Sequence, residues 1–169
     1  MESSTAPAMP EWEVSQWFNT PRPIRVADLR GRVVLVHAFQ MLCPGCVINA
    51  IPQARRVHEL YAERGVAVIG LHTVFEHHDA MPPHALEAFV HEYGLRFPVG
   101  VDMPSEGGQP LPHTMLRMGW QGTPTTLVLR KIFLGDTDTQ GQPRSPAARG
   151  RGGNVDGVGS TKNSPNHRA

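Results

Sequence analysis

This chain of 169 residues lacks several features that would assign it to a common class of protein. It has only two cysteines, whereas a zinc site usually needs two such pairs or one pair with matched histidines. Its net charge is +1 and 18% of its residues are charged, so neither nucleic acid nor a membrane surface is an expected partner. No stretch approaches the ~18 apolar residues of a membrane span.

The N-terminus also lacks a targeting signal. Residues 1–7 contain neither the basic cluster nor the apolar run of a secretory signal peptide. We therefore expect a cytoplasmic protein. In that reducing compartment a close pair of cysteines rests as a dithiol, which favours a working redox pair over a structural disulfide.

The two cysteines that are present, Cys43 and Cys46, follow directly after an apolar run, residues 32–39, that predicts a buried strand. With CxxC spacing, the two sulfurs can meet if Cys46 lies on the first turn of a helix. Free N–H groups and the helix dipole then stabilise a thiolate on Cys43, whose pKa can fall from ~8.5 to roughly 3.5–7.5. The pattern predicts a redox site; a structural disulfide and half of a metal site are the alternatives.

The remaining pattern predicts an α/β domain over residues 23–134, after an N-terminal extension over 1–22. We expect a short edge strand at 24–26, buried strands at 32–39 and 66–72, a short third strand at 97–102, and a last strand at 125–129. Helices are expected at 44–64, with a kink at Pro52 and a stop at Gly65, and at 83–93. One or two helical turns are expected at 111–118.

Three segments of the chain resemble thioredoxin-fold redoxins, namely the TlpA-like thiol–disulfide oxidoreductases and the peroxiredoxin-like proteins of AhpC/TSA type. Residues 26–39 resemble that group's turn into its central strand, residues 43–46 (CPGC) its redox motif, and residues 122–129 the segment with its cis-proline. The resemblance covers about residues 22–134. It implies a thioredoxin-like fold, with helices flanking a central mixed sheet.

The same resemblance implies what each site residue does. Cys43 would be the exposed nucleophile, and Cys46 the buried thiol that resolves the mixed disulfide. Pro124 would form a cis peptide bond against the CxxC turn, and Thr123 would offer its backbone to a bound substrate strand. The implied function is a thiol–disulfide oxidoreductase that acts on a disulfide-containing protein or a small thiol; we expect no cofactor and no metal.

Two positions near the motif depart from the family's pattern. Leu42 stands where an aromatic residue usually precedes the first cysteine, so the substrate platform differs. His37, six residues before Cys43, stands where relatives often carry Asp or Asn. A histidine there can relay a proton from Cys46 or stabilise the Cys43 thiolate; the alternative is a histidine held by backbone groups on its strand.

The end of the chain departs most from the pattern. Its last 35 residues contain seven glycines and no aromatic residue, Leu, Ile or Met, so they bury too little to offset chain entropy. We predict a disordered tail over 135–169 and no C-terminal helix. One face of the sheet would then be partly uncovered, which favours self-association.

Two other functions stay open. A peroxidase of peroxiredoxin type would have Cys43 oxidised by peroxide to a sulfenic acid. That chemistry favours a threonine three residues before the cysteine, where this chain has Gln40. The other alternative is a non-enzymatic module that senses redox state or binds a metal, for which residues 76–79 (Glu-His-His-Asp) are the densest cluster of candidate ligands.

Overall fold

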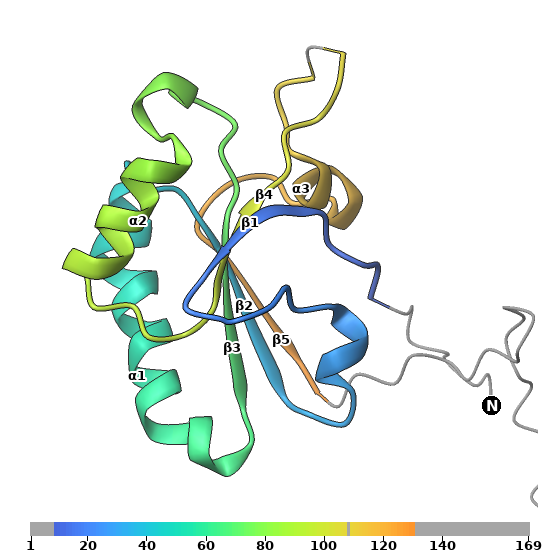
Figure 1. Ribbon diagram of the computed structural model, residues 1–169, viewed down its shortest axis with the longest axis vertical. Helices are drawn as coiled ribbons and strands as arrows, with labels where there is room; N and C mark the ends of the chain where they lie inside the picture. Colours follow the sequence, from blue (N-terminus) through green and yellow to red (C-terminus); the bar gives the residue numbers. More distant parts are fainter. Residues whose placement is uncertain (1–8, 108, 131–169) are drawn as a thin grey trace, which may run out of the picture. The chain divides into compact units, whose positions relative to one another are not determined.

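The computed structural model describes residues 9–107 and 109–130 of the chain. They form a five-stranded sheet in the order β1-β4-β3-β2-β5 (Figure 1). The strands are β1 (Val14–Phe18), β2 (Val34–Phe39), β3 (Ala67–His72), β4 (Val99–Asp102) and β5 (Thr125–Leu129). Strands β2, β3 and β4 are parallel, whereas β1 and β5 pair antiparallel at the two edges. The predicted α/β fold with a central mixed sheet is confirmed.

Helices lie on both sides of this sheet. Helices α1 and α2 lie together on one side, and η1 lies on the other (Figure 1). The helical elements are η1 (Val26–Leu29), η2 (Cys46–Ala50), α1 (Ile51–Tyr61), η3 (Ala62–Arg64), η4 (His78–Ala80), α2 (Pro83–Glu92) and α3 (His113–Met118). Among the described residues, no helix has both the length and the apolar character needed to cross a membrane.

The larger core lies between the sheet and helices α1 and α2. Strand β2 is buried at every position, as the apolar run predicted, because both faces of the sheet are covered there. On the α1 and α2 side, the buried residues that pack together include Leu35, Phe39, Cys46, Ile51, Ala54, Leu86 and Val90. The redox motif therefore adjoins the larger core, to which Cys46 belongs.

The opposite face is covered mainly by the N-terminal segment. Trp12, Val26 and Leu29 pack against Val34 and Val36 of β2. The predicted edge strand at 24–26 is wrong, because Val26 begins η1 instead. The edge strand is β1, which pairs with β4 and lies within the segment 1–22 that we predicted to be an N-terminal extension.

The helical region after the motif begins and ends as predicted, with an irregularity near Pro52. Its first turn, η2, is π-helical, and α1 starts with Pro52 in its first turn. Proline has no N–H to donate to the preceding turn, so the regular ladder is interrupted there. Gly65 ends the region with a left-handed φ of 88°, which glycine adopts without a Cβ clash.

Asp102 at the end of β4 anchors α3, which leads into the loop before β5. Its carboxylate accepts the N–H groups of Thr114 at 2.9 Å and Met115 at 3.1 Å, and also the Thr73 hydroxyl at 3.0 Å. These bonds satisfy the second and third N–H groups of a helix whose own N-cap residue, Pro112, provides no side-chain cap. The predictions of a disordered tail and a missing C-terminal helix lie outside the described residues.

Candidate active site

The redox motif lies in the turn between β2 and η2. The Cys43 N–H donates to the Gln40 carbonyl at 3.2 Å, and the Val47 N–H donates to the Cys43 carbonyl at 3.1 Å. The second bond is the first i→i+4 bond of the helical region, so Cys43 lies at its N-terminus and Cys46 in its first turn. The position predicted from the CxxC spacing is the one observed.

The two cysteines are free thiols in different surroundings. Cys43 is half-buried; its sulfur accepts the Cys46 N–H at 3.3 Å and donates to the Thr123 carbonyl at 3.5 Å. Cys46 is fully buried, and this burial, followed by its hydrogen bond with Cys43, raises the pKa of Cys46 to about 12. At neutral pH Cys46 therefore keeps its proton, whereas Cys43 has an N–H donor placed to stabilise a thiolate.

The loop before β5 closes over the motif. The peptide bond between Thr123 and Pro124 is cis, as the resemblance implied. Pro124 lies so close to Gly45 that a Cβ on Gly45 would be 3.4 Å from the Pro124 Cδ atom. The structure thus brings together Cys43, Cys46, Thr123 and Pro124, four of the five residues named from the sequence.

His37, the fifth residue, lies on β2 beneath the motif and is fully buried. Its Nδ1 atom is 3.2 Å from the Thr126 hydroxyl on β5, and its ring stacks on Phe39. Burial lowers the pKa of His37 to about 4, so the ring is neutral at pH 7. Within the part of the chain that the structure describes, no hydrogen bond joins His37 to either sulfur, and its Nε2 atom has no partner. A neutral ring cannot stabilise the Cys43 thiolate as a cation.

Gln40 is a site residue that the sequence reasoning missed. It is buried, and its side-chain amide reaches two other loops. The amide oxygen accepts the Phe75 N–H at 3.2 Å, while the amide nitrogen donates to the Glu76 carboxylate at 3.3 Å and to the Thr123 hydroxyl at 3.4 Å. A signal was present: a polar residue directly follows a wholly buried strand, three residues before Cys43.

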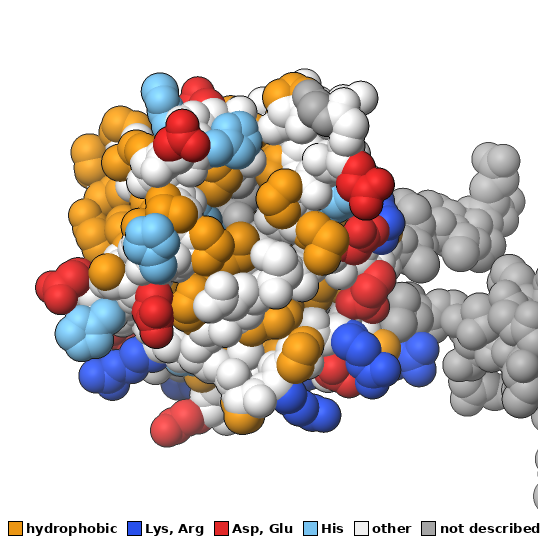
Figure 2. All heavy atoms as spheres, turned by 45° about the horizontal axis from the view of Figure 1, so that its top comes forward, with side chains coloured by type: hydrophobic (Ala, Val, Ile, Leu, Met, Phe, Trp, Pro, Cys, Tyr) orange, Lys and Arg blue, Asp and Glu red, His pale blue; other side chains and the backbone are white. Residues whose placement is uncertain are grey.

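The rest of this edge of the sheet is partly apolar. Figure 2 looks toward the end of the domain at which β2, β3 and β4 finish, and hydrophobic side chains gather there between acidic and histidine side chains. Leu42, Met103 and Leu116 are 57%, 37% and 43% exposed. The residues 76–79 do not form a metal site, since no group of three ligating side chains comes together in residues 9–107 and 109–130.

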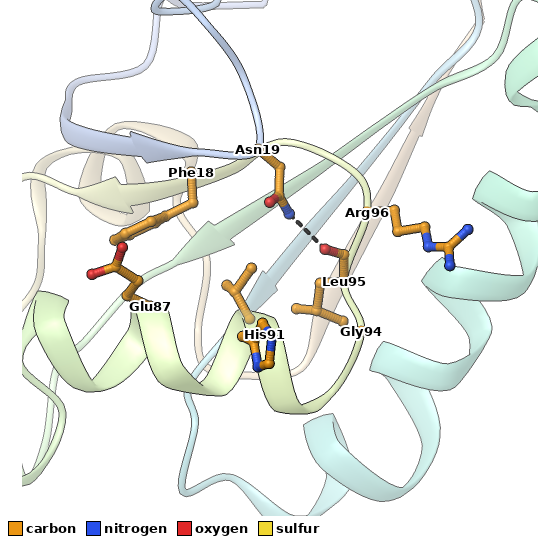
Figure 3. Close-up of a pocket in the computed structure, with 8 residues that line it drawn as sticks. Phe18, Asn19, Glu87, His91, Gly94, Leu95 and Arg96 are labelled. Atoms are coloured by element: carbon orange, nitrogen blue, oxygen red, sulfur yellow. Dashed lines mark hydrogen bonds between the residues drawn. The ribbon is translucent and has the colours of Figure 1, made fainter.

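A separate hollow of about 440 Å³ lies on the surface away from the thiols. It is bounded by Phe18 at the end of β1 and the adjacent Asn19, by Glu87 and His91 on α2, and by the loop before β4 (Figure 3). Along one wall of the hollow, the side-chain amide of Asn19 donates to the Leu95 carbonyl at 2.6 Å. No cysteine lines it, so we do not place the redox chemistry there.

Two solved structures are similar over most of their length. A crystal structure described as a thioredoxin-like superfamily protein is 48% identical with a TM-score of 0.70, and the match covers 82% of this chain and 83% of that one. A thiol-disulfide isomerase from Corynebacterium glutamicum is 46% identical with a TM-score of 0.69, covering 83% and 84% of the two chains. The thioredoxin-like fold is therefore confirmed.

Curated relatives match over about half of this chain. Protein DipZ of Mycobacterium tuberculosis is 32% identical over 91 residues, which are 53% of this chain and 13% of that protein. The thiol-disulfide oxidoreductase ResA of Halalkalibacterium halodurans is 29% identical over 98 residues, 55% of this chain and 52% of that one. This chain thus spans a small part of DipZ and about half of ResA.

The family comparison extends further along the chain. The AhpC/TSA family model matches residues 6–138, which include every strand of the sheet and all the residues of the candidate site. This match confirms the resemblance to the redoxins. The chain belongs to the AhpC/TSA family.

Proposed function

We propose that this protein is a thiol–disulfide oxidoreductase in which Cys43 is the nucleophile and Cys46 the resolving thiol. The observation that carries the proposal is the Cys46 N–H directed at the Cys43 sulfur at 3.3 Å, at the start of a helical region. An N–H donor at a helix N-terminus stabilises negative charge on that sulfur. Only Cys43 of the two thiols has any exposure to a large substrate.

The reaction follows from these two environments. The Cys43 thiolate attacks one sulfur of a substrate disulfide, forms a mixed disulfide and releases the other substrate sulfur as a thiolate. Cys46 then attacks the Cys43 sulfur, giving its proton to the departing substrate thiolate. The first substrate thiolate takes up from solvent the proton that Cys43 lost when its thiolate formed. The cysteine pair ends as a disulfide and the substrate as two thiols, so two electrons have passed to the substrate. The reverse sequence oxidises a dithiol.

Thr123 and Pro124 are proposed to hold the substrate beside Cys43. The Thr123 carbonyl accepts the Cys43 thiol at 3.5 Å in the free protein and is released from that bond when the thiolate forms. It is then available to a backbone N–H of an extended substrate. For His37, the bond to Thr126 supports a positioning role, in which it ties β5 and the preceding loop to β2.

The partners and compartment stay predictions. ResA and the Corynebacterium glutamicum protein are named as a thiol-disulfide oxidoreductase and isomerase, which supports disulfide-containing proteins as substrates here. We expect a cytoplasmic location, as inferred from the sequence. Self-association is proposed through a partly uncovered face of the sheet, as inferred from the sequence, and the 58% exposure of Val128 on β5 supports it.

A redox titration tests the proposal. The protein is equilibrated in thiol/disulfide buffers, and free thiols are counted by the mass added on alkylation, with Cys43→Ser as the control. A reversible two-electron couple between about −270 and −120 mV is expected. A couple well below about −300 mV would identify a structural disulfide instead. Rapid consumption of hydrogen peroxide would favour the peroxidase alternative, and stoichiometric zinc with unreactive thiols the metal-binding module.

A further inference from the structure

Gln40 lies where three loops of the active site meet. Its backbone carbonyl accepts the Cys43 N–H at 3.2 Å, within the CxxC turn. Its side-chain oxygen accepts the Phe75 N–H from the loop after β3, and its side-chain nitrogen donates to Thr123 in the loop before β5. One buried residue therefore links the nucleophile's turn to both neighbouring loops.

The orientation of the Gln40 amide is determined by its partners. A backbone N–H can only donate, so the amide oxygen must face Phe75. The amide nitrogen then faces the other way, where Thr123 and the Glu76 carboxylate accept its two N–H groups. Because Gln40 is only 1% exposed, water cannot readily replace these partners.

Thr123 connects this amide to the nucleophilic sulfur. Its hydroxyl oxygen accepts from the Gln40 amide at 3.4 Å, and its carbonyl accepts the Cys43 thiol at 3.5 Å. The second contact exists only in the dithiol, because the thiol hydrogen of Cys43 is absent once the disulfide has formed.

We infer that Gln40 is a positioning residue that holds Thr123 against the Cys43 thiol and thereby stabilises the dithiol over the disulfide. The inference rests on the proposed function. In the balanced reaction, the dithiol and oxidised glutathione give the protein disulfide and two reduced glutathiones. Releasing Thr123 removes its contact with the Cys43 thiol from the dithiol side, so the equilibrium moves toward the protein disulfide.

Gln40→Met tests the inference, because methionine has nearly the same length and no amide. We expect the equilibrium constant with glutathione to rise about tenfold toward the disulfide, which is about 30 mV for a two-electron couple. His72→Met is the matched control. His72 is also fully buried, at the end of the next strand, but its ring has no hydrogen bond within the described residues. Its equilibrium constant should stay within twofold of the wild type.

A double-mutant cycle with Thr123→Val separates positioning from general loosening. If Gln40 acts through the Thr123 hydroxyl, Thr123→Val shifts the equilibrium in the same direction and adding Gln40→Met causes little further change. Gln40→Leu, which also lacks both donors and adds no charge beside Glu76, should shift it similarly and serves if the methionine variant does not fold.

Two results would overturn the inference while leaving the proposed function intact. One is a wild-type couple that is reversible together with Gln40 variants that stay within twofold of it. The other is fully additive effects of Gln40→Met and Thr123→Val. A wild type with no reversible couple would instead refute the proposed function, and the inference with it.

Discussion

The exposed rim of the site and the buried layer beneath it differ in whether they can carry charge, although each contains one cysteine of the CxxC motif. The rim contains Leu42 and Cys43, which water and substrate can reach. The buried layer contains His37, Cys46 and His72, each 0% exposed. Burial keeps the layer uncharged, while the rim can carry a thiolate. Two intervening residues suffice to place one thiol in each environment.

The largest expected effect comes from removing each thiol in turn. Cys43→Ser should abolish turnover of a disulfide substrate, because the buried Cys46 cannot take over the attack. Cys46→Ser should still react once and then accumulate the mixed disulfide. Its release should slow by about 10³-fold or more at millimolar external thiol, since an intramolecular attack becomes bimolecular. Mass spectrometry of the trapped adduct and a turnover assay measure the two steps.

Reaction of the buried cysteine with substrate would contradict this difference between the two thiols. A mixed disulfide trapped on Cys46 in the Cys43→Ser protein would mean that the buried thiol reaches substrate. Equal alkylation rates of the two cysteines in the native dithiol would contradict the assignment in the same way.

Acid should lower the free energy of unfolding because the buried layer contains two histidines that are neutral in the folded protein. Burial lowers the pKa of His37 and of His72 to about 4, from 6.5 in the unfolded chain. Above pH 6.5 both rings are neutral in both states, and this part of the stability is fully present. Between pH 6.5 and about 4 the unfolded chain binds protons that the folded chain does not, so the free energy of unfolding falls. At about 1.4 kcal/mol for a pKa difference of one, each histidine accounts for at most about 3.5 kcal/mol.

Urea unfolding at several pH values between 7 and 4.5 measures this loss. His72→Met provides the internal reference, because it removes one of the two buried histidines and leaves every carboxylate in place. Its stability should decline less steeply over this range. A decline identical to that of the wild type would show that His72 is protonated in the folded state or solvated.

At pH 7 the same substitution should stabilise the protein. Neither ring nitrogen of His72 has a hydrogen-bond partner among the described residues, and an unsatisfied buried polar group costs about 1–3 kcal/mol. Methionine fills a similar volume without that cost. His37→Met should raise the stability less, because it also breaks the contact with Thr126. Calorimetric melting of the three proteins at pH 7 compares them; a less stable His72→Met protein would contradict the expectation.

The strand and the helical region that carry the buried layer could be predicted largely from local sequence. The run at residues 32–39 is apolar at nearly every position, which signals a strand covered on both faces, and β2 is buried throughout. Gly65 ends the helical region with a left-handed φ, which is a local property of glycine. Cys43 and Cys46 were predicted as a redox pair from their spacing after the strand, whereas Thr123 and Pro124 came from the family resemblance, and the structure brings these four residues together.

The missed features depend on partners far along the chain. The side-chain partners of Gln40 are 35, 36 and 83 residues away, so no local pattern reports them. Strand β1 is recognised only through its pairing with β4, as in the match of Trp17 with Gly100. The neutral state of His37 results from burial by the whole fold, which its position in the sequence does not reveal.

The smallest expected effect is on substrate binding at the exposed rim. Leu42 directly precedes Cys43 and is 57% exposed, so a bound substrate can bury the rest of its side chain. Leu42→Ala should weaken substrate binding by about 0.5–1 kcal/mol, a rise of about two- to fivefold in KM with kcat unchanged. Leu60→Ala is the matched control, because Leu60 is 45% exposed near the far end of α1. If Leu42→Ala instead lowers kcat at constant KM, Leu42 acts by positioning Cys43. The exposed rim would then hold its thiol as closely as the buried layer holds Cys46.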